Sequence, residues 1–214
     1  EGLIVRPSDL LPGDILLFHS LSGKTPAKQI RKATGSPYTH AAIYLGNGEI
    51  GESNIPRVGI RNLLSSDLKS HRIGVLRTQM GFSAERAASV REFAAELAGK
   101  FSFYDFTGVA TFKRKHKKFY EDVLAEIARN YGKVKSADEL MKETYFCSAF
   151  VVACYMVAGL IGDSAQVAYP PDVISPGDLP RDPTFGWLAG YLVPDGAEIP
   201  ANAPLLALTL WKDN

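Results

Sequence analysis

The sequence predicts an α+β fold, because it contains hydrophobic patterns of both kinds. Residues 15–19, 38–45, 49–55 and 71–78 read as alternating runs, which is typical of β-strands. Residues 83–99 instead repeat apolar side chains at the helical period. A third observation is the continuous apolar run at residues 149–158, which follows Cys147 and predicts a buried helix.

The strands are predicted in order from the start of the chain. In "SDLLPGDILLFHS" a Pro-Gly-Asp turn precedes a strand that begins at Ile15. "SPYTHAAIYLGNGEIGESNI" predicts a hairpin that turns at residues 46–48, and "HRIGVLRT" predicts a further strand. A short helix is expected at residues 26–34, and "PLLALTLW" at residues 204–211 is a plausible last strand.

Helices account for most of the rest. Ser83 is a suitable N-cap for a helix that ends near Gly99, with one apolar face formed by Ala87, Val90, Phe93, Ala94 and Leu97. Residues 112–143 predict two polar helices, split near Gly132 and restarted by a Ser136 cap with Glu139 three residues on. This charged section, taken as about residues 108–143, is expected to be an insertion. The cysteine helix is expected to stop at Gly159 and Gly162.

Size and composition favour one domain over residues 1–214. The 214 residues are 46% hydrophobic and 22% charged, which suffices for a single core. Lys and Arg number 24 against 23 Asp and Glu, so the net charge of +1 gives no field that would draw the chain to nucleic acid. No nucleic-acid partner is therefore expected.

The compartment stays open. Cys147 and Cys154 stand about two helical turns apart, roughly 10 Å, which is too far for a disulfide. The run at residues 149–158 is well short of the roughly 20 residues that span a bilayer, so no membrane anchor is expected. Because the chain opens with Glu1 rather than Met, a processed product that has lost a signal peptide is among the possibilities.

Cys147 is the candidate nucleophile. A cysteine in an apolar helix is most often a packing residue, and Cys154 within "VVACYMVA" fits that description. Cys147 differs because it falls in the first turn of the helix, where unpaired N–H groups and the helix dipole favour a thiolate. Its own backbone N–H could also serve as an oxyanion-hole donor in acyl transfer.

A nucleophilic thiolate needs an imidazole, and the chain offers four histidines. His40 is the preferred partner, because it lies in a strand of small and apolar residues. A structural histidine that is simply hydrogen-bonded in the strand would give the same sequence pattern. His19, at the end of the first strand, is held in reserve. His71 is expected at the surface, and His116 is expected to be solvated within a basic run.

Strand parity decides which group can orient His40. A two-residue Asn47-Gly48 turn would place Ile43 opposite Glu52 and point His40 away from that carboxylate. A three-residue loop at residues 46–48 would instead place Ala42 opposite Glu52, with His40 opposite Asn54 on the same face. The hypothesis therefore requires the three-residue loop and leaves Glu52 and Asn54 as rival orienting groups.

The order His40, Glu52, Cys147 resembles that of the circularly permuted NlpC/P60 papain-like proteins, and more narrowly the YaeF/YiiX group. The matching motifs are "PGDILLF", "GSPYTHAAIYLGNGEIGES", "GKFSFYDF" and "YFCSAFVVACY". They cover roughly residues 8–60 and 90–180. The resemblance implies an antiparallel sheet or small barrel packed against the cysteine-bearing helix, with the helical insertion added. It also slightly favours a cell-envelope or secreted location.

Carried over residue by residue, the resemblance implies Cys147 as nucleophile, His40 as base and then acid, and Glu52 as the orienting group. Further binding or oxyanion candidates are Tyr145, Tyr38, Asn54, His19 and Tyr104. Tyr104 and Asp105 fall on the family's Tyr-Asp pair, whose implied role is structural or pocket-lining. The sequence departs from the family at Ala149, where a carboxylate is often found, and this affects substrate preference.

Three functions remain open. The leading hypothesis is a cysteine peptidase or amidase that cleaves a peptide or cell-envelope amide through a thioester, without a cofactor. The second is a lipid-directed acyltransferase or phospholipase like the LRAT-type relatives of this fold. It is motivated by the apolar and basic stretch at residues 106–118, which could touch a membrane surface, although a solvated helix face is the ordinary reading. The third is an inactive binding module that uses the same groove.

Two other sites are not expected. "LSGKT" lacks the first glycine of a phosphate loop, since position 18 is Phe18. A zinc site is not expected, because the chain has no Cys-x-x-Cys pair and no close pair of histidines.

Overall fold

The computed structural model describes residues 4–20, 31–32, 34–100 and 102–193. Its strands are β1 (Ile4–Val5), β2 (Ile15–Ser20), β3 (His40–Gly46), β4 (Glu49–Asn54), β5 (Arg57–Asn62), β6 (His71–Arg77) and β7 (Trp187–Leu192). Its helices are α2 (Ser65–Ser70), α3 (Ala84–Gly99), α4 (Phe106–Glu121), α5 (Val123–Asn130), α6 (Ala137–Leu140) and α7 (Cys147–Val157). Short 3₁₀ helices are η1 (Pro7–Asp9), η2 (Asp163–Ala168), η3 (Pro171–Val173), η4 (Leu179–Arg181) and η5 (Pro183–Phe185).

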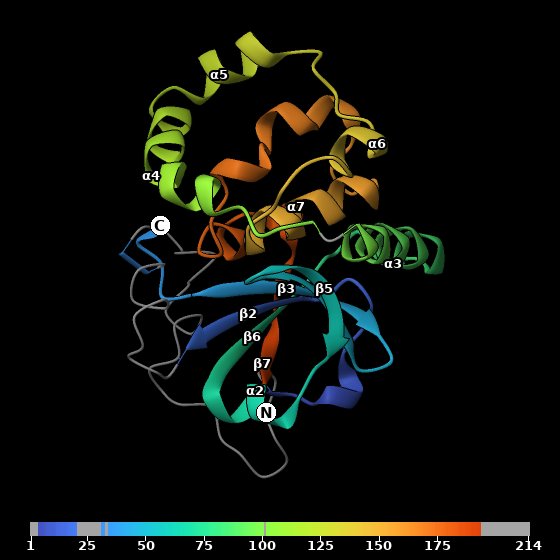
Figure 1. Cartoon of the computed structure of the whole chain (residues 1–214). Helices are drawn as coiled ribbons and strands as arrows, with labels where there is room; N and C mark the ends of the chain where they lie inside the picture. Colours follow the sequence, from blue (N-terminus) through green and yellow to red (C-terminus); the bar gives the residue numbers. More distant parts are fainter. Residues whose placement is uncertain (1–3, 21–30, 33, 101, 194–214) are drawn as a thin grey trace.

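Within these residues the strands form one seven-stranded sheet, in the order β1-β7-β6-β2-β3-β4-β5. All neighbouring strands are antiparallel except β1 and β7, which are parallel. Figure 1 shows α3 to α7 gathered on one side of the curved sheet. The protein is therefore α+β, as the sequence predicts.

Each face of the sheet carries its own apolar cluster. In β2, Ile15 and Leu17 belong to the cluster that contains α3 and α7, whereas Leu16 and Phe18 belong to a second cluster on the opposite face. This alternation follows from the two-residue period of a strand. Because both faces are covered, all of β2 except the half-buried His19 is buried.

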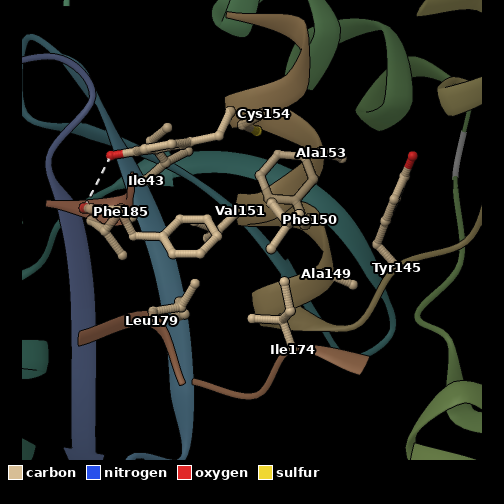
Figure 2. Packing of buried hydrophobic residues seen from close by; sticks show 14 of the residues in the cluster. Ile43, Tyr145, Ala149, Phe150, Val151, Ala153, Cys154, Ile174, Leu179 and Phe185 are labelled. Atoms are coloured by element: carbon tan, nitrogen blue, oxygen red, sulfur yellow. Dashed lines mark hydrogen bonds between the residues drawn. The ribbon is translucent and has the colours of Figure 1, made fainter. Parts of the chain in front are cut away.

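Helix α7 is apolar all round and therefore needs cover on every side. It packs on β3 and β4, on α3 and on η3, and all its residues from Cys147 to Met156 are buried. Figure 2 shows Phe150 and Val151 of α7 beside Ile43 of the sheet and Phe185 of η5. Burying one such side chain contributes about 1.5–3 kcal/mol. The chain turns away after α7 at Gly159, which has a left-handed φ of 67°.

The other helices follow the predicted pattern with two differences. Ser83 caps α3 through a hydrogen bond from Arg86 N, and Ser136 with Glu139 forms the capping box of α6, as predicted. However, α4 begins at Phe106, earlier than the sequence suggests. A break also separates α4 from α5 at Asp122, whose carboxylate accepts from Ala125 N at 3.0 Å. The predicted polar section is therefore three helices rather than two.

The β3–β4 hairpin differs from the predicted three-residue loop. Gly46 pairs with Glu49, so the loop has two residues, Asn47 and Gly48, with φ of 54° and 77°. A bulge after Tyr44 then shifts the register, so that Tyr44 pairs with Ile50 and Ile43 with Gly51. The register that the hypothesis needs is present, but the bulge supplies it and not the loop length.

Several elements were not predicted: β1, β5, α2 and β7. β1 has only two residues, and β5 has exposed polar ends, so their apolar patterns are weak. The predicted helix at residues 26–34 lies largely outside the described residues, and the predicted strand at residues 204–211 lies wholly outside them.

Candidate active site

His40 and Glu52 face each other across the β3–β4 pair. Continuing the observed register places Ala42 opposite Glu52, so the two titratable side chains lie on one face and are diagonal neighbours. His40 Nε2 and Glu52 Oε2 are 2.7 Å apart. The rival orienting group, Asn54, instead accepts a hydrogen bond from Ile55 N at 2.8 Å. Glu52 is therefore the partner of the imidazole in this structure.

Cys147 is the first residue of α7 and is only 3% exposed. Ser53 of β4 donates to Tyr145 O at 2.6 Å, and this bond fixes the segment before α7 against the sheet. Cys147 lies close enough to His40 to contribute to the raised pKa of the imidazole. Because His40 Nε2 faces Glu52, its Nδ1 is the nitrogen left for the thiol.

Arg61 was missed by the sequence analysis. It lies on β5, which pairs with β4 so that Glu52 opposes Gly59 and Ile50 opposes Arg61. Arg61 Nε donates to Glu52 Oε1 at 2.7 Å, and Arg61 Nη1 donates to Asp67 Oδ2 at 2.8 Å. The signal that could have revealed it is "RVGIRN", a short third strand of the meander that places Arg57, Gly59 and Arg61 on one face.

The charges of this cluster stabilise one another. Burial alone would lower the pKa of His40, but Glu52 and Cys147 outweigh it and raise the pKa to about 10. Burial alone would raise the pKa of Glu52, but His40 and Arg61 outweigh it and lower the pKa to about 2. At neutral pH the pair is therefore an imidazolium and a carboxylate.

This pair predicts a pH dependence of stability. The His40 contribution is complete below pH 6.5 and is lost as pH rises through about 10. The Glu52 contribution is complete above pH 4.5 and is lost as pH falls through about 2. Urea unfolding is expected to show the full contribution of both groups between pH 4.5 and 6.5, and the free energy of unfolding should fall as pH rises from 6.5 through about 10.

The comparison that isolates this effect is wild type against His40→Gln across the same pH series. The variant keeps a polar side chain but has no proton to lose, so its alkaline limb should be flatter than that of wild type. Parallel curves for the two proteins would contradict the assignment of the alkaline loss to His40.

Two cavities meet at Tyr104. One has a volume of about 260 Å³ and is lined by Phe18, Ser20, Thr39, His40, Asn54, Ile55, Arg61, Asp67, His71 and Tyr104. The other, of about 20 Å³, is an apolar slot at the thiol, lined by Thr34, Tyr104, Val109, Phe112, Phe146, Cys147 and Pro176. Burial and then the charge at Cys147 raise the pKa of the Tyr104 phenol well above its usual value. Tyr104 thus lines both the cavity that contains His40 and the slot that contains Cys147.

The remaining candidates are not brought to the thiol. Tyr145 is buried, and its hydroxyl donates to Leu140 O at 2.5 Å, so it anchors the chain before α7. Tyr38 is buried in the core beside Tyr191, and burial followed by Tyr191 raises its pKa. His19 follows Phe18, which pairs with His40, so its side chain leaves the sheet on the opposite face from His40.

Two histidines differ from their predicted surface positions. His71 lines the larger cavity and packs edge-on against Phe18, with the ring centroids 5.5 Å apart. Its Nδ1 donates a hydrogen bond to Asp67 O at 3.3 Å. His116 packs against the rings of Phe112 and Tyr120 and lies 3.3 Å from Asp178 Oδ2. Both are half-buried, because the neighbouring aromatic side chains cover them.

The basic run at residues 113–118 is partly neutralised. Ion pairs join Lys115 to Asp172 at 2.7 Å, Lys117 to Glu121 at 3.8 Å and Lys118 to Glu126 at 3.3 Å. Among the residues described, no group of three or more His, Cys, Asp or Glu side chains is placed to hold a metal ion. Nor does any helix in the described ranges combine the length and apolarity needed to cross a membrane.

The chain is similar in sequence to a known protein. The chain is 31% identical over 185 residues to the "Probable lipoprotein peptidase YaeF" of Escherichia coli. The match covers 82% of this chain and 64% of the relative, so the chain spans less than two thirds of that protein.

Other comparisons add little. Among solved structures, the chain is similar to the crystal structure of metalloprotein yiiX from Escherichia coli O157:H7, with 22% identity and a TM-score of 0.43. That likeness covers 69% of this chain and 65% of the other. No family model matches the chain. The sequence similarity to YaeF supports a YaeF/YiiX-like group for this protein.

Proposed function

We propose that this protein is a cysteine hydrolase that cleaves an amide through a thioester, with Cys147 as nucleophile, His40 as base and acid, and Glu52 as orienting group. The observation that carries the proposal is the 2.7 Å contact between His40 Nε2 and Glu52 Oε2, with Cys147 at a helix N-terminus close enough to help raise the pKa of His40. Such a thiol, imidazole and carboxylate series is the arrangement that activates a thiol nucleophile.

The steps follow from this geometry. The Cys147 sulfur, having given its proton to His40, attacks the substrate carbonyl carbon and forms a tetrahedral oxyanion. Because Cys147 is the first residue of α7, its backbone N–H has no acceptor within the helix and can be directed at that oxyanion. His40 then protonates the leaving amine as the C–N bond breaks, which leaves a thioester. Water gives a proton to His40 as it attacks the thioester carbonyl carbon. The C–S bond then breaks, and His40 returns the proton to the sulfur, which releases the carboxylic acid and restores the Cys147 thiol.

The same proposal covers fold and substrate class. A permuted papain-like domain is supported by the order of the triad along the chain and by α7 packing on β3 and β4. The name of the relative YaeF supports peptide or lipoprotein substrates and a place in the cell envelope. Val109 and Phe112 of α4 line the apolar slot at Cys147, which supports a role for the inserted helices in covering one side of the nucleophile.

Lipid ester cleavage is the second candidate. Besides the apolar slot, Phe103 and Phe106 are exposed by 67% and 57% next to Tyr104, which lies in both cavities. Exposed aromatic side chains beside a helix with exposed basic residues are typical of proteins that lie on a lipid surface. Fatty-acid release from liposomes would favour this candidate over the amide hydrolase.

The test is capture of the acyl-enzyme. Wild-type protein is mixed with p-nitroanilides and p-nitrophenyl esters of amino acids and fatty acids, quenched in acid, and analysed by peptide mass mapping. The expected result is a hydroxylamine-sensitive acyl group on the peptide that carries Cys147, and the better acyl donor identifies the substrate class. Product release without any acyl group on Cys147, or no reaction with any donor, would contradict the proposal.

A further inference from the structure

Arg61 lies in the wall of the larger cavity beside His40, where an arginine would ordinarily be expected to bind an anionic substrate. Its hydrogen bonds argue against that role. Nε donates to Glu52 Oε1 at 2.7 Å, and Nη2 donates to Glu52 Oε2 at 3.3 Å. The other bonds run from Nη1 to Asp67 Oδ2 at 2.8 Å, from Nη1 to Asn62 O at 3.1 Å and from Nη2 to Asp67 Oδ1 at 3.4 Å.

A guanidinium has five N–H groups, and these bonds account for all five. No donor of Arg61 is left for a substrate carboxylate or phosphate. The group is instead a bidentate clamp on Glu52 that is itself clamped by Asp67. Its position in the cavity wall is therefore compatible with a role behind the reacting atoms.

Glu52 needs such a clamp. The torsion that rotates a carboxylate has a broad energy profile, so the side chain alone does not set the plane of its oxygens. Gly59 opposes Glu52 on β5 and contributes no side chain, which leaves the carboxylate free on that side and lets Arg61 reach it diagonally. Both oxygens of Glu52 then have partners. Oε1 accepts a hydrogen bond from Arg61, and Oε2 contacts both His40 and Arg61.

Asp67 fixes the other side of the guanidinium. Its Oδ2 also accepts from Leu64 N at 2.8 Å, at the start of α2, so its position is set by the backbone. The contacts thus form one series from the start of α2 through Asp67, Arg61 and Glu52 to His40. Arg61 is 33% exposed and Asp67 is 15% exposed, so the two side chains are partly shielded from water.

We propose that Arg61, braced by Asp67, is a positioning residue that fixes the Glu52 carboxylate so that one oxygen faces His40 Nε2. The proposal rests on the proposed function, because the purpose of orienting His40 is to serve Cys147. It adds a fourth and a fifth member to the predicted triad, neither of which touches substrate. It also assigns a purpose to β5 and α2, the two elements that carry Arg61 and Asp67.

The test compares Arg61→Lys and Arg61→Gln with wild type. The pKa of His40 is measured by NMR of the ¹⁵N-labelled imidazole, and the reactivity of Cys147 is measured by the rate of alkylation with iodoacetamide. The charged and titratable groups around His40 are Glu52, Arg61, His71, Tyr104 and Cys147. Both variants are expected to lower the His40 pKa and to slow alkylation by about tenfold or more, since small misplacements of a catalytic group have effects of this size.

The direction of the change in the His40 pKa distinguishes loss of positioning from the direct effect of removing the Arg61 charge. Removing a positive charge near His40 would by itself raise the His40 pKa, so a fall requires that the Glu52 carboxylate has moved. Lysine keeps the charge but lacks the planar fork, so Arg61→Lys tests the geometry alone. An unchanged or raised His40 pKa in Arg61→Lys would overturn the proposal.

Arg77→Lys is the matched control. Arg77 grips Asp14 in the same bidentate manner, with Nε at 2.8 Å and Nη2 at 2.7 Å, and its side chain is 35% exposed. Loss of that clamp should lower the melting temperature without changing His40 or alkylation. If Arg61→Gln fails to fold, Asp67→Asn replaces it, because it keeps Arg61 and an acceptor for Leu64 N while weakening the brace. Because loss of the Asp67 charge would by itself lower the His40 pKa, the readout for this variant is the alkylation rate of Cys147, which should fall by about tenfold or more; an unchanged rate would count against the proposal.

The two hypotheses can fail separately. A lowered His40 pKa in Arg61→Lys, with no acyl group on Cys147 from any donor, would leave the clamp standing and remove the hydrolase. Acyl-enzyme formation at an unchanged rate in Arg61→Lys, with an unchanged His40 pKa, would leave the hydrolase standing and remove the clamp.

Discussion

Cys147→Ala is expected to abolish turnover of any amide or ester that forms a thioester with the wild-type protein. In the proposed mechanism the covalent step belongs to the Cys147 sulfur at the start of α7, and the second cysteine of the chain, Cys154, is fully buried. Loss of a nucleophile of this kind lowers kcat by about 10⁶-fold. The measurement is product release over hours at saturating substrate, together with the mass of the quenched protein.

Cys154→Ala is the matched control for that experiment. Cys154 lies on the same helix and is fully buried, and burial raises its pKa well above the usual value for a thiol. The substitution leaves a small cavity, so stability should fall by about 1 kcal/mol while activity is retained. Retained turnover in Cys147→Ala, or turnover lost only in Cys154→Ala, would place the nucleophile elsewhere.

The residues of the candidate triad were accessible from the sequence because each has a local signal. Cys147 stands at the start of an apolar helix, and helix starts are marked by the change in pattern after Thr144. His40 and Glu52 lie in a hairpin whose two-residue alternation assigns faces. Within such elements, sequence periodicity and three-dimensional position are tied by backbone geometry.

Three features were not predicted correctly: the length of the β3–β4 loop, the helix break at Asp122 and the contact of Arg61 with Glu52. Their signals in the sequence are weak or depend on residues far apart in the chain. A bulge shifts a register without changing the hydrophobic pattern that surrounds it, so the loop at Asn47 and Gly48 was given the wrong length. Asp122 does carry a local cap signal, but the helical pattern on both sides hides the break. Arg61 acquires its meaning only when β5 pairs with β4, and that pairing is a tertiary contact.

Glu52 and Asn54 could not be separated by parity, because both lie on the face of His40. The structure separates them by what each side chain already binds: Asn54 accepts from the next backbone N–H, whereas Glu52 is held between His40 and Arg61. A strand residue's face is thus predictable, while its hydrogen-bond partner depends on the neighbouring strand. This distinction leads to the second large effect.

Glu52→Gln is expected to lower kcat by about 10⁴-fold while leaving the nucleophile in place, since loss of the orienting carboxylate of a triad has an effect of this size. The glutamine has the same shape, but it offers one acceptor oxygen where Glu52 offers two, and both are in use. Without the negative charge, burial of His40 is no longer opposed, so the His40 pKa should fall from its raised value.

The control is Glu49→Gln on the same strand. Glu49 pairs with Arg91 at 2.8 Å at the far end of β4, so it reports the effect of losing a surface ion pair without touching His40. Its kcat should stay within about twofold of wild type, because exposed pairs contribute little. The decisive comparison is between Glu52→Gln and Asn54→Ala. If kcat falls in Asn54→Ala and not in Glu52→Gln, then the Asn54 amide orients His40 during turnover and the Glu52 carboxylate contributes only to stability.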